Sequence, residues 1–349
     1  NLELIFLSLG VDLMFKKYFK NVIMLVSIIS CLTAEINVYT HRHYDSDKIL
    51  FKKFTDMFGI EVNVIKGSAD QLIQRLQSEG KNSPADILLT VDAGRLVRAK
   101  NMGLLEQVSS KTLTKNVPEK MRDSENHWFG LSVRARVIAY AKDRVKESQL
   151  STYEDLADPK WKGKIVVRSS NNIYNQSLMA SLINENGADN ALKWAKSVRK
   201  NMARKPRGND RDQARAVASG VADLAIINTY YLGLLANSSD KADREVAEKL
   251  NIFFPNQNGR GTHINVSGAA VTKSSTNKKE AIKFLEFLTD QENQRVFSEA
   301  NYEYPLDYNN SKSKIHLKWG RFKADNIDLS ILGENNSEAV KIFDLAGWE

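Results

Sequence analysis

The chain has 349 residues, of which 42% are hydrophobic and 26% charged, and its formal net charge is +8. This length can bury a substantial core in one large domain or two, and the composition excludes a low-complexity or disordered chain. The positive charge raises the question of nucleic acid, but basic and acidic residues alternate in segment 189–215, and zinc-finger and RNP-type motifs are absent. We therefore predict no nucleic-acid partner and a mildly basic, solvated surface that favours anions or an anionic membrane surface.

The first predicted element is an export signal. Three lysines follow Met14 within six residues, and an apolar stretch at 22–29 and then small residues come next. This order is typical of a secretory signal, and the apolar stretch is short for a spanning helix. Residues 1–13 do not begin with Met and are interpreted as an upstream extension, with Met14 as the expected start.

Three outcomes for this signal remain open at the level of the sequence. Cleavage after Ala34 would release a soluble product, lipid on Cys31 in "IISC" would give a lipoprotein, and an uncleaved signal would act as an anchor. Cys31 is the only cysteine, so the mature chain has no disulfide framework and no thiolate metal site. We expect segment 1–34 to be extension and signal, and the exported domain to begin near Glu35 and to reside in the periplasm.

The exported chain opens with alternating strand and helix patterns. Strands are predicted at 35–40, 60–67 and 85–92, and helical spacing appears at 46–59 and 68–80. Strands separated by short helices predict a parallel, doubly wound sheet.

A second series of elements begins near residue 129. We expect a strand at 129–142, a loop and strand at 151–170, helix at 175–201, helix then strand at 214–231, extended chain at 250–275, and one amphipathic helix at 277–301. Two α/β units, each with its own doubly wound sheet, predict a bilobal molecule with a central cleft. In such sheets ligands gather at the carboxyl ends of the strands.

Five polar residues fall at predicted strand ends. His43 and Tyr44 follow the first strand, Tyr174 follows the strand within 151–170, and Tyr230 and Tyr231 follow the strand within 214–231. We expect these four phenols and one imidazole to converge on one cleft, although each could instead pack locally or face solvent. The adjacent tyrosines can reach one ion only if the backbone turns at the pair, and nearby Gly233 would permit such a turn.

The chemistry of these side chains favours iron. A free phenol loses its proton only near pH 10, but a small, highly charged cation can hold it as phenolate. Ferric iron prefers such hard oxygen donors and also accepts a neutral imidazole. The segment "HRHY" lacks the i, i+4 spacing of a helical zinc pair, and the EF-hand pattern of calcium sites is absent.

Other segments that resemble functional motifs do not predict a catalytic or cofactor-binding site. The segment "GRGTHI" has Ile264 where a dinucleotide-binding loop needs glycine, and the serines lack a nucleophile elbow, so we predict no enzyme. His127 and His263 lack metal-ligand spacing and are expected to be structural. Trp128 and Trp161 are expected to pack in the core.

Seven blocks of sequence, taken in order, resemble the FutA-type ferric-iron-binding proteins of cyanobacteria. They are "THRHYDSD", "NSPADILLTVD", "WFGLSVRARVI", "STYEDLADPKWKGKIVVRSSNNIYNQSL", "GNDRDQARAVASGVADLAIINTYYLG", "FFPNQNGRGTHINVSGAAV" and "NYEYPL". The resemblance extends from residue 35 to the final "AGWE" and implies a monomeric solute receptor with the bilobal type II periplasmic-binding-protein fold. It further implies delivery of iron to the permease and ATPase of an ABC importer.

The resemblance also implies the ligand set. The iron ligands would be His43, Tyr44, Tyr174, Tyr230 and Tyr231, without a required carbonate or phosphate. Relatives with a glutamate, a histidine and two tyrosines complete the shell with a bound anion, but here a tyrosine stands next to the histidine in "HRHYD" and no matching glutamate is found.

Charge arithmetic suggests one further residue. Four phenolates around Fe(III) leave one net negative charge, which is costly when buried unless a cation lies nearby. Arg134 in "SVRARV" is the candidate cation, since an arginine of this block lies beside the site in the family; an ion pair between the lobes is the alternative. Fe(II) would leave two negative charges, so we expect weaker ferrous binding.

The expected domain division follows the same resemblance. The first lobe would comprise 35–134 and 264–312, the second lobe 135–263, and a C-terminal helical segment at 313–349 would pack on both. Three other functions remain open: an iron-sequestering protein without a transporter, a receptor for a small organic or anionic solute, and an oxidative metalloenzyme. The last fits least, because such a site keeps an open coordination position.

Overall fold

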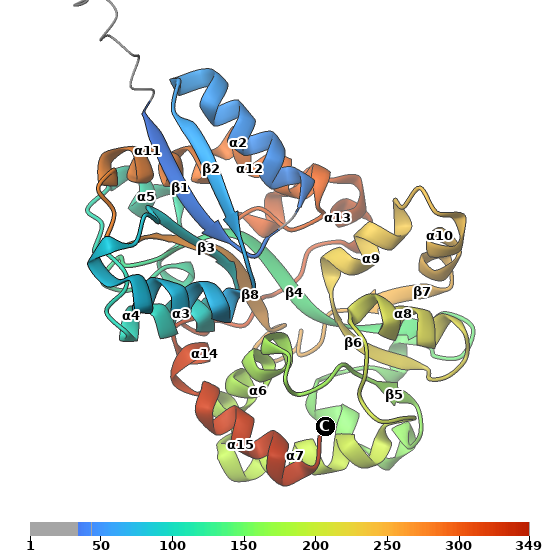
Figure 1. Ribbon diagram of the computed structural model, residues 1–349. Coiled ribbons are helices and arrows are strands. Elements are labelled where there is room, and N and C mark those ends of the chain that lie inside the picture. The colour runs from blue at the N-terminus through green and yellow to red at the C-terminus, as the bar shows by residue number, and fades with distance from the viewer. Residues whose placement is uncertain (1–33, 43, 349) are drawn as a thin grey trace, which may run out of the picture.

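The computed structural model describes residues 34–42 and 44–348, and Figure 1 shows an upper and a lower lobe. Met14, Cys31 and the candidate ligand His43 lie outside the described residues. Within the described part, no helix is both long and apolar enough to cross a membrane.

The upper lobe is built on five strands. They are β1 (Glu35–Thr40), β2 (Glu61–Lys66), β3 (Ile87–Val91), β8 (Ile264–Val271) and the first part of β4 (Phe129–Ala141). Strand β1 pairs in parallel with β2 and β3, whereas β8 pairs antiparallel with both β3 and β4. The helices of this lobe are α2 (Asp45–Phe58), α3 (Ala69–Glu79), α4 (Ala93–Asn101), α5 (Lys111–Asn116), α11 (Lys278–Thr289), α12 (Gln291–Ala300) and α13 (Lys314–Trp319).

The lower lobe continues from the second part of β4. That part pairs antiparallel with β6 (Leu224–Asn228) and β7 (Leu250–Phe253), and β6 pairs in parallel with the short β5 (Ile165–Val166). The helices of this part are α6 (Ile173–Asn186), α7 (Ala188–Asn201), α8 (Asp210–Ala218), α9 (Thr229–Ala236) and α10 (Lys241–Glu248). Short 3₁₀ turns in the chain are Gly80–Asn82, Glu119–Met121, Glu147–Gln149, Glu154–Ala157, Pro159–Trp161 and Tyr308–Asn310.

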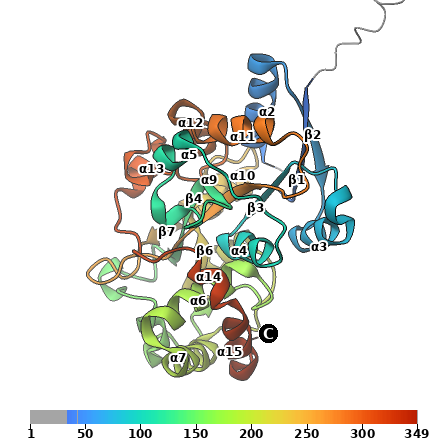
Figure 2. The same cartoon turned by 90° about the vertical axis from the view of Figure 1, so that its left-hand side faces the viewer.

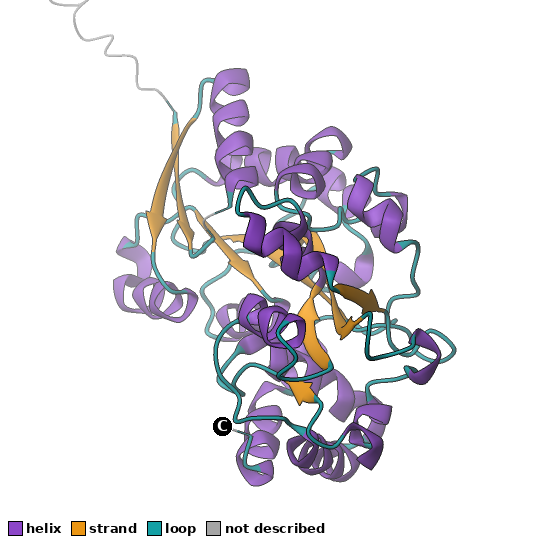
Figure 3. Cartoon of the chain, turned by 90° about the vertical axis from the view of Figure 1, so that its right-hand side faces the viewer, coloured by secondary structure: helices purple, strands orange, loops and turns teal. Residues whose placement is uncertain are grey.

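Strand β4 connects the two lobes. All 13 of its residues are buried, its first part pairs with β8, and its second part pairs with β6 and β7. The two predicted sheets are therefore not separate but share this strand, in the order β2-β1-β3-β8-β4-β6-β5. Figure 3 shows the strands running through the centre of the molecule with helices on the outside. The α/β prediction is confirmed, and the predicted boundary at 134/135 falls inside β4.

The C-terminal helices lie across the two lobes. Helix α14 (Ile331–Glu334) contacts α4 and α6, and α15 (Asn336–Ala346) contacts α6 and α7. Figure 2 shows α15 beside α7 at the lower end of the molecule. These contacts connect the end of the chain to both lobes.

Two predicted helices are each divided in two. Segment 175–201 breaks at Gly187, whose φ of 76° lies outside the helical range and separates α6 from α7. Segment 277–301 breaks at Asp290, whose extended backbone ends α11 and whose side chain accepts a hydrogen bond from the Glu292 amide to cap α12. In both segments helix-forming residues continue on each side of the break, so the pattern alone predicted one helix.

Candidate metal centre

Tyr230 and Tyr231 lie in the first turn of a helix rather than at the end of a strand. Strand β6 ends at Asn228, and α9 begins at Thr229. The bend in the chain therefore comes just before the tyrosine pair. The two rings stack with centroids 4.2 Å apart, so successive residues present neighbouring phenols to the same region.

Gly233 does not make the turn that the sequence suggested. It lies inside α9, and a Cβ at this position would come within 2.6 Å of the Tyr302 side chain. Glycine is needed here because it allows α9 to approach Tyr302 closely.

The other two candidate phenols also stand at helix starts. Tyr44 is the extended residue that precedes α2, and Tyr174 is the second residue of α6, where its amide donates to the Asn172 side chain. Helices α2, α6 and α9 thus all begin around the phenols. The positive ends of helix dipoles favour negative charge there.

The hydroxyl groups of three tyrosines meet at one point. Tyr44 Oη donates to Tyr230 Oη at 3.3 Å, and Tyr174 Oη lies 3.4 Å from the same atom. The Tyr44 side chain comes from the first lobe and the other two from the second. The structure therefore brings together four of the five predicted ligands, Tyr231 through its stacking on Tyr230, while His43 lies outside the described residues.

Burial raises the pKa of Tyr44, Tyr230 and Tyr231 and so keeps these three phenols protonated in the absence of a cation. Tyr230 is 1% exposed, and burial, followed by the proximity of the other phenols, raises its pKa well above its usual value. Burial likewise raises the pKa of Tyr44 and of Tyr231. A multivalent cation bound between the phenol oxygens would lower their pKa again, since it stabilises the phenolate form.

A ring of arginines surrounds the phenols. The Arg42 guanidinium lies 4.6 Å from the centroid of the Tyr44 ring, and Arg211 lies 6.0 Å from that of Tyr231. Three more guanidinium groups face the Tyr174 ring, at 5.1 Å for Arg134, 5.9 Å for Arg136 and 5.4 Å for Arg168.

Arg134 both faces a candidate phenol and forms an ion pair with a residue of the first lobe. It faces Tyr174, and its Nη2 lies 3.4 Å from Asp92 Oδ2, on a residue that directly follows β3 of the first lobe. The sequence reading missed Arg136, although the signal was available. Residues two apart on a strand point to the same face, so the "RAR" of β4 directs both arginines to one side.

Buried carboxylates balance the arginines. Asp47 and Glu303 both bind Arg42, at 2.8 and 3.0 Å. Asp210 binds Arg136 at 2.6 Å and Arg168 at 3.3 Å, and Asp92 pairs with Arg134. These four carboxylates pair with four of the five arginines of the ring, all except Arg211, and so balance most of the positive charge around the phenols.

His41 and His263, two histidines that are not proposed as ligands, have different surroundings. His41 Nδ1 lies 3.3 Å from Thr90 Oγ1. His263 is buried, and burial followed by neighbouring arginines lowers its pKa well below the usual value, so it stays neutral as expected for a structural residue.

His127 is less isolated than its spacing suggested. One ligand atom each of Asp123, Glu125 and His127 lies within 4.8 Å of the others. The Lys100 ammonium already pairs with both carboxylates, at 2.8 and 2.7 Å. A lysine thus supplies the positive charge there, which leaves His127 in a structural role.

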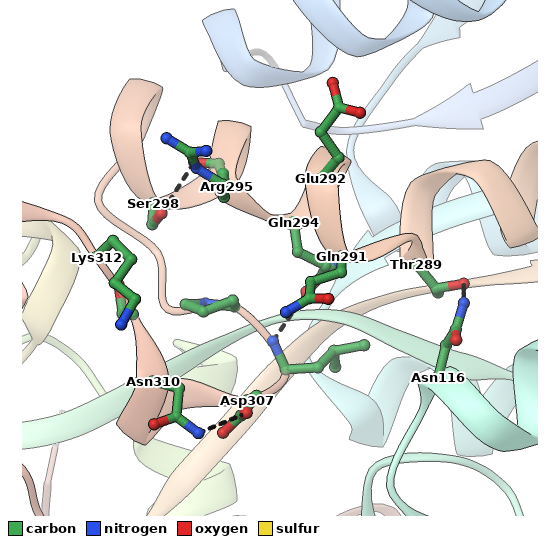
Figure 4. Close-up of a pocket in the computed structure, with 13 residues that line it drawn as sticks. Asn116, Thr289, Gln291, Glu292, Gln294, Arg295, Ser298, Asp307, Asn310 and Lys312 are labelled. Atoms are coloured by element: carbon green, nitrogen blue, oxygen red, sulfur yellow. Dashed lines mark hydrogen bonds between the residues drawn. The ribbon is translucent and has the colours of Figure 1, made fainter.

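A large cavity lies away from the phenols. It has a volume of about 630 Å³ and is lined by α12 and by segment 305–312, together with Asn116 and Thr289. Figure 4 shows amide, carboxylate and ammonium groups around it. None of the described lining residues is a tyrosine, so cavity size does not identify the candidate centre.

Comparison with known proteins places the chain in a family. The family described as "Bacterial extracellular solute-binding protein" matches residues 82–328. Iron uptake protein A1 of Synechocystis is 50% identical over 315 residues, which is 90% of this chain and 88% of the relative.

Solved structures show the same fold. Trichodesmium FutA "in complex with iron and citrate ligands" has a TM-score of 0.88 and 52% identity, covering 90% of this chain and 100% of the other. Mannheimia haemolytica ferric iron-binding protein A "in an open conformation" has a TM-score of 0.83 and 41% identity, covering 90% and 99%. The bilobal type II prediction is confirmed, and the family is one of solute-binding proteins rather than of enzymes. The chain therefore belongs to the bacterial extracellular solute-binding protein family, with relatives of the FutA type.

Proposed function

We propose that this protein is an exported receptor that binds Fe(III) through His43, Tyr44, Tyr174, Tyr230 and Tyr231. The observation that carries the proposal is the meeting of the Tyr44 and Tyr174 hydroxyls on that of Tyr230. Phenolates that share one position are the hard anionic oxygen donors that ferric iron prefers. The names of the relatives, an iron uptake protein and ferric iron-binding proteins, support the same cargo.

Lobe closure would complete the iron shell. The first lobe, 35–134 with 264–312, supplies His43 and Tyr44, and the second lobe, 135–263, supplies the other three ligands. The open relative from Mannheimia supports movement between such lobes. Release would follow reopening, assisted by protonation of a phenolate or by reduction of the iron.

The receptor would deliver its iron to an ABC importer from the periplasm, as a monomer. Iron uptake by a strain lacking this gene distinguishes delivery from sequestration. Delivery predicts reduced uptake, whereas a protein that only sequesters iron leaves the uptake rate unchanged.

A small organic solute fits the site less well than an ion. The space lined by Tyr174, Arg134, Arg136 and their neighbours is too small to hold a water molecule. Pockets for organic ligands usually measure about 300 to 1,000 Å³. The structure therefore leaves no room for an organic solute beside Tyr174, which favours an ion over an organic solute as the cargo.

Titration of the metal-free protein with Fe(III) tests the proposal. Ferric phenolate complexes absorb visible light by charge transfer from ligand to metal, so we expect a red-orange protein with one iron per chain. Absorbance should saturate at that ratio and disappear when a strong chelator removes the metal. A protein that stays colourless with excess Fe(III) would exclude the tyrosinate site.

Arg134→Ala is expected to change the valence preference of the site. The guanidinium offsets the negative charge of the phenolates, and this charge is larger around Fe(II) than around Fe(III). Removing it should weaken ferrous binding more than ferric binding, by about tenfold if one buried charge interaction of about 1.4 kcal/mol is lost. Chelator competition with Fe(II) and with Fe(III) measures the ratio of the two affinities. A ratio equal to that of the wild type would contradict this role of Arg134.

A further inference from the structure

Asp92 occupies an unusual position beside the candidate centre. It directly follows β3, its side chain caps α4 by accepting from the Gly94 amide at 3.0 Å, and the residue is 0% exposed. Its φ of 84° lies in the left-handed region that residues other than glycine rarely adopt. Strained residues of this kind persist where the surroundings hold them, often at functional sites.

The Asp92 carboxylate joins groups from several parts of the chain. Ser177 Oγ donates to it at 2.8 Å, Asn265 Nδ2 donates at 2.8 Å, and Arg134 Nη2 lies at 3.4 Å. Ser177 belongs to α6 of the lower lobe, whereas Asp92 follows β3 of the upper lobe and Asn265 and Arg134 lie on the connecting strands β8 and β4 (Figure 1). The carboxylate therefore binds the two lobes to each other.

Two of these partners of Asp92, Ser177 and Arg134, lie next to the candidate iron ligand Tyr174. Ser177 stands three residues after Tyr174 on α6, so the two side chains occupy neighbouring positions on one face of the helix. Arg134 places its guanidinium 5.1 Å from the centroid of the Tyr174 ring. Asp92 thus holds both the helix that carries Tyr174 and the cation that faces it.

We propose that Asp92 is a positioning residue for the iron site, which holds Tyr174 through Ser177 and Arg134 and locks the lobes together when they close. This inference rests on the proposed function. Opening the lobes would separate Ser177 from Asp92 and leave a carboxylate with fewer partners. Closure restores the hydrogen bond at the same time as it brings Tyr44 to Tyr230.

Ser177→Ala tests the lock without changing any charge. A hydrogen bond to a charged group corresponds to about a tenfold to hundredfold change in an equilibrium constant. We expect iron to leave the full-length variant for a chelator at least about tenfold faster, since the hydroxyl both holds the lobes together and positions Tyr174.

Small-angle scattering of the metal-free protein gives a readout that does not depend on iron. The Ser177→Ala variant should populate open shapes and show a larger radius of gyration than the wild type. Ser132→Ala is the matched control, because the buried Ser132 hydroxyl has no hydrogen-bond partner among the described residues. Equal iron release and equal radii in the Ser177 and Ser132 variants would overturn the lock.

Asp92→Asn tests the charge with little change in size. It frees the Arg134 cation to act on the Tyr174 phenolate, so the affinity for Fe(II) should rise about tenfold relative to the affinity for Fe(III). This change in the affinity ratio is opposite to the change expected for Arg134→Ala. The charge-transfer band should move to shorter wavelength, because a phenolate stabilised by a cation gives up its electron less readily. A valence ratio and absorption maximum equal to those of the wild type would overturn this part.

Failure of this inference is distinguishable from failure of the proposed function. A wild-type protein that binds no iron contradicts the receptor function itself, and the scattering comparison would still test the lock. A wild-type protein that binds iron with the expected colour, together with variants that behave like it, contradicts only the role of Asp92.

Discussion

Replacing both Tyr230 and Tyr231 with phenylalanine is expected to lower the affinity for Fe(III) by about a thousandfold or more and to weaken the visible absorption band, since only two phenolates remain. Loss of outer residues around a metal typically costs about 10- to 100-fold in affinity, and loss of two direct anionic ligands should exceed this. The change removes only two oxygen atoms, and the rings can keep their stacking at 4.2 Å. The fold should therefore survive while the donor set does not.

The measurement is chelator competition followed in the visible spectrum, with thermal unfolding recorded on the same samples. The matched control is Tyr140→Phe combined with Tyr308→Phe. This variant also removes two phenol oxygens, one of which hydrogen-bonds to Glu147, and neither residue contacts the four candidate phenols in the structure described. The control should keep full colour. Full colour in the Tyr230 and Tyr231 variant would exclude these residues as ligands.

Iron binding is expected to release protons and to strengthen steeply as pH rises. Burial raises the pKa of Tyr44, Tyr230 and Tyr231, so the metal-free phenols are protonated throughout the range from pH 6 to pH 8. Each phenol that becomes a ligand must lose its proton, and each displaced proton contributes about a tenfold change in affinity per pH unit. The four proposed phenolate ligands predict about a ten-thousandfold gain per pH unit, with the weaker binding on the acid side.

Two experiments measure this coupling. Proton release in a weakly buffered solution should approach about four per iron bound, after correction for the protons released by the ferric chelate used as donor. Chelator competition at several pH values should give the same number as the slope of log K against pH. Tyr231→Phe should release one proton fewer than the wild type. Release of one proton or none by the wild type would show that the phenols do not bind iron as phenolates.

Local sequence patterns were sufficient for the alternation of strands and helices. The predicted strands at 35–40, 85–92 and 129–142 correspond to β1, β3 and β4. Apolar periodicity and the positions of residues that end helices and strands are local properties, so they can be interpreted without knowing what packs against each element. They failed at Gly187 and Asp290, where the backbone conformation of one residue ends a helix although helix-forming residues continue on both sides.

The sequence by itself determined the donor types and their positions at chain reversals. Tyr44, Tyr174, Tyr230 and Tyr231 all follow strands, and in an α/β fold such positions come together at one edge. It also indicated a ferric cargo, because phenols without paired cysteines or carboxylate clusters suit a hard trivalent cation. These inferences depend only on residue type and order along the chain.

Only the tertiary structure decided which side chains share the site. The meeting of Tyr44 with Tyr230, and the bond from Ser177 to Asp92, join residues 186 and 85 positions apart. The role of Gly233 also depended on Tyr302, which lies far along the chain. Such contacts depend on how the two lobes are placed by β4 and β8, and local propensity carries no information about that placement. The balance of buried arginines and carboxylates around the phenols is a property of the folded chain for the same reason.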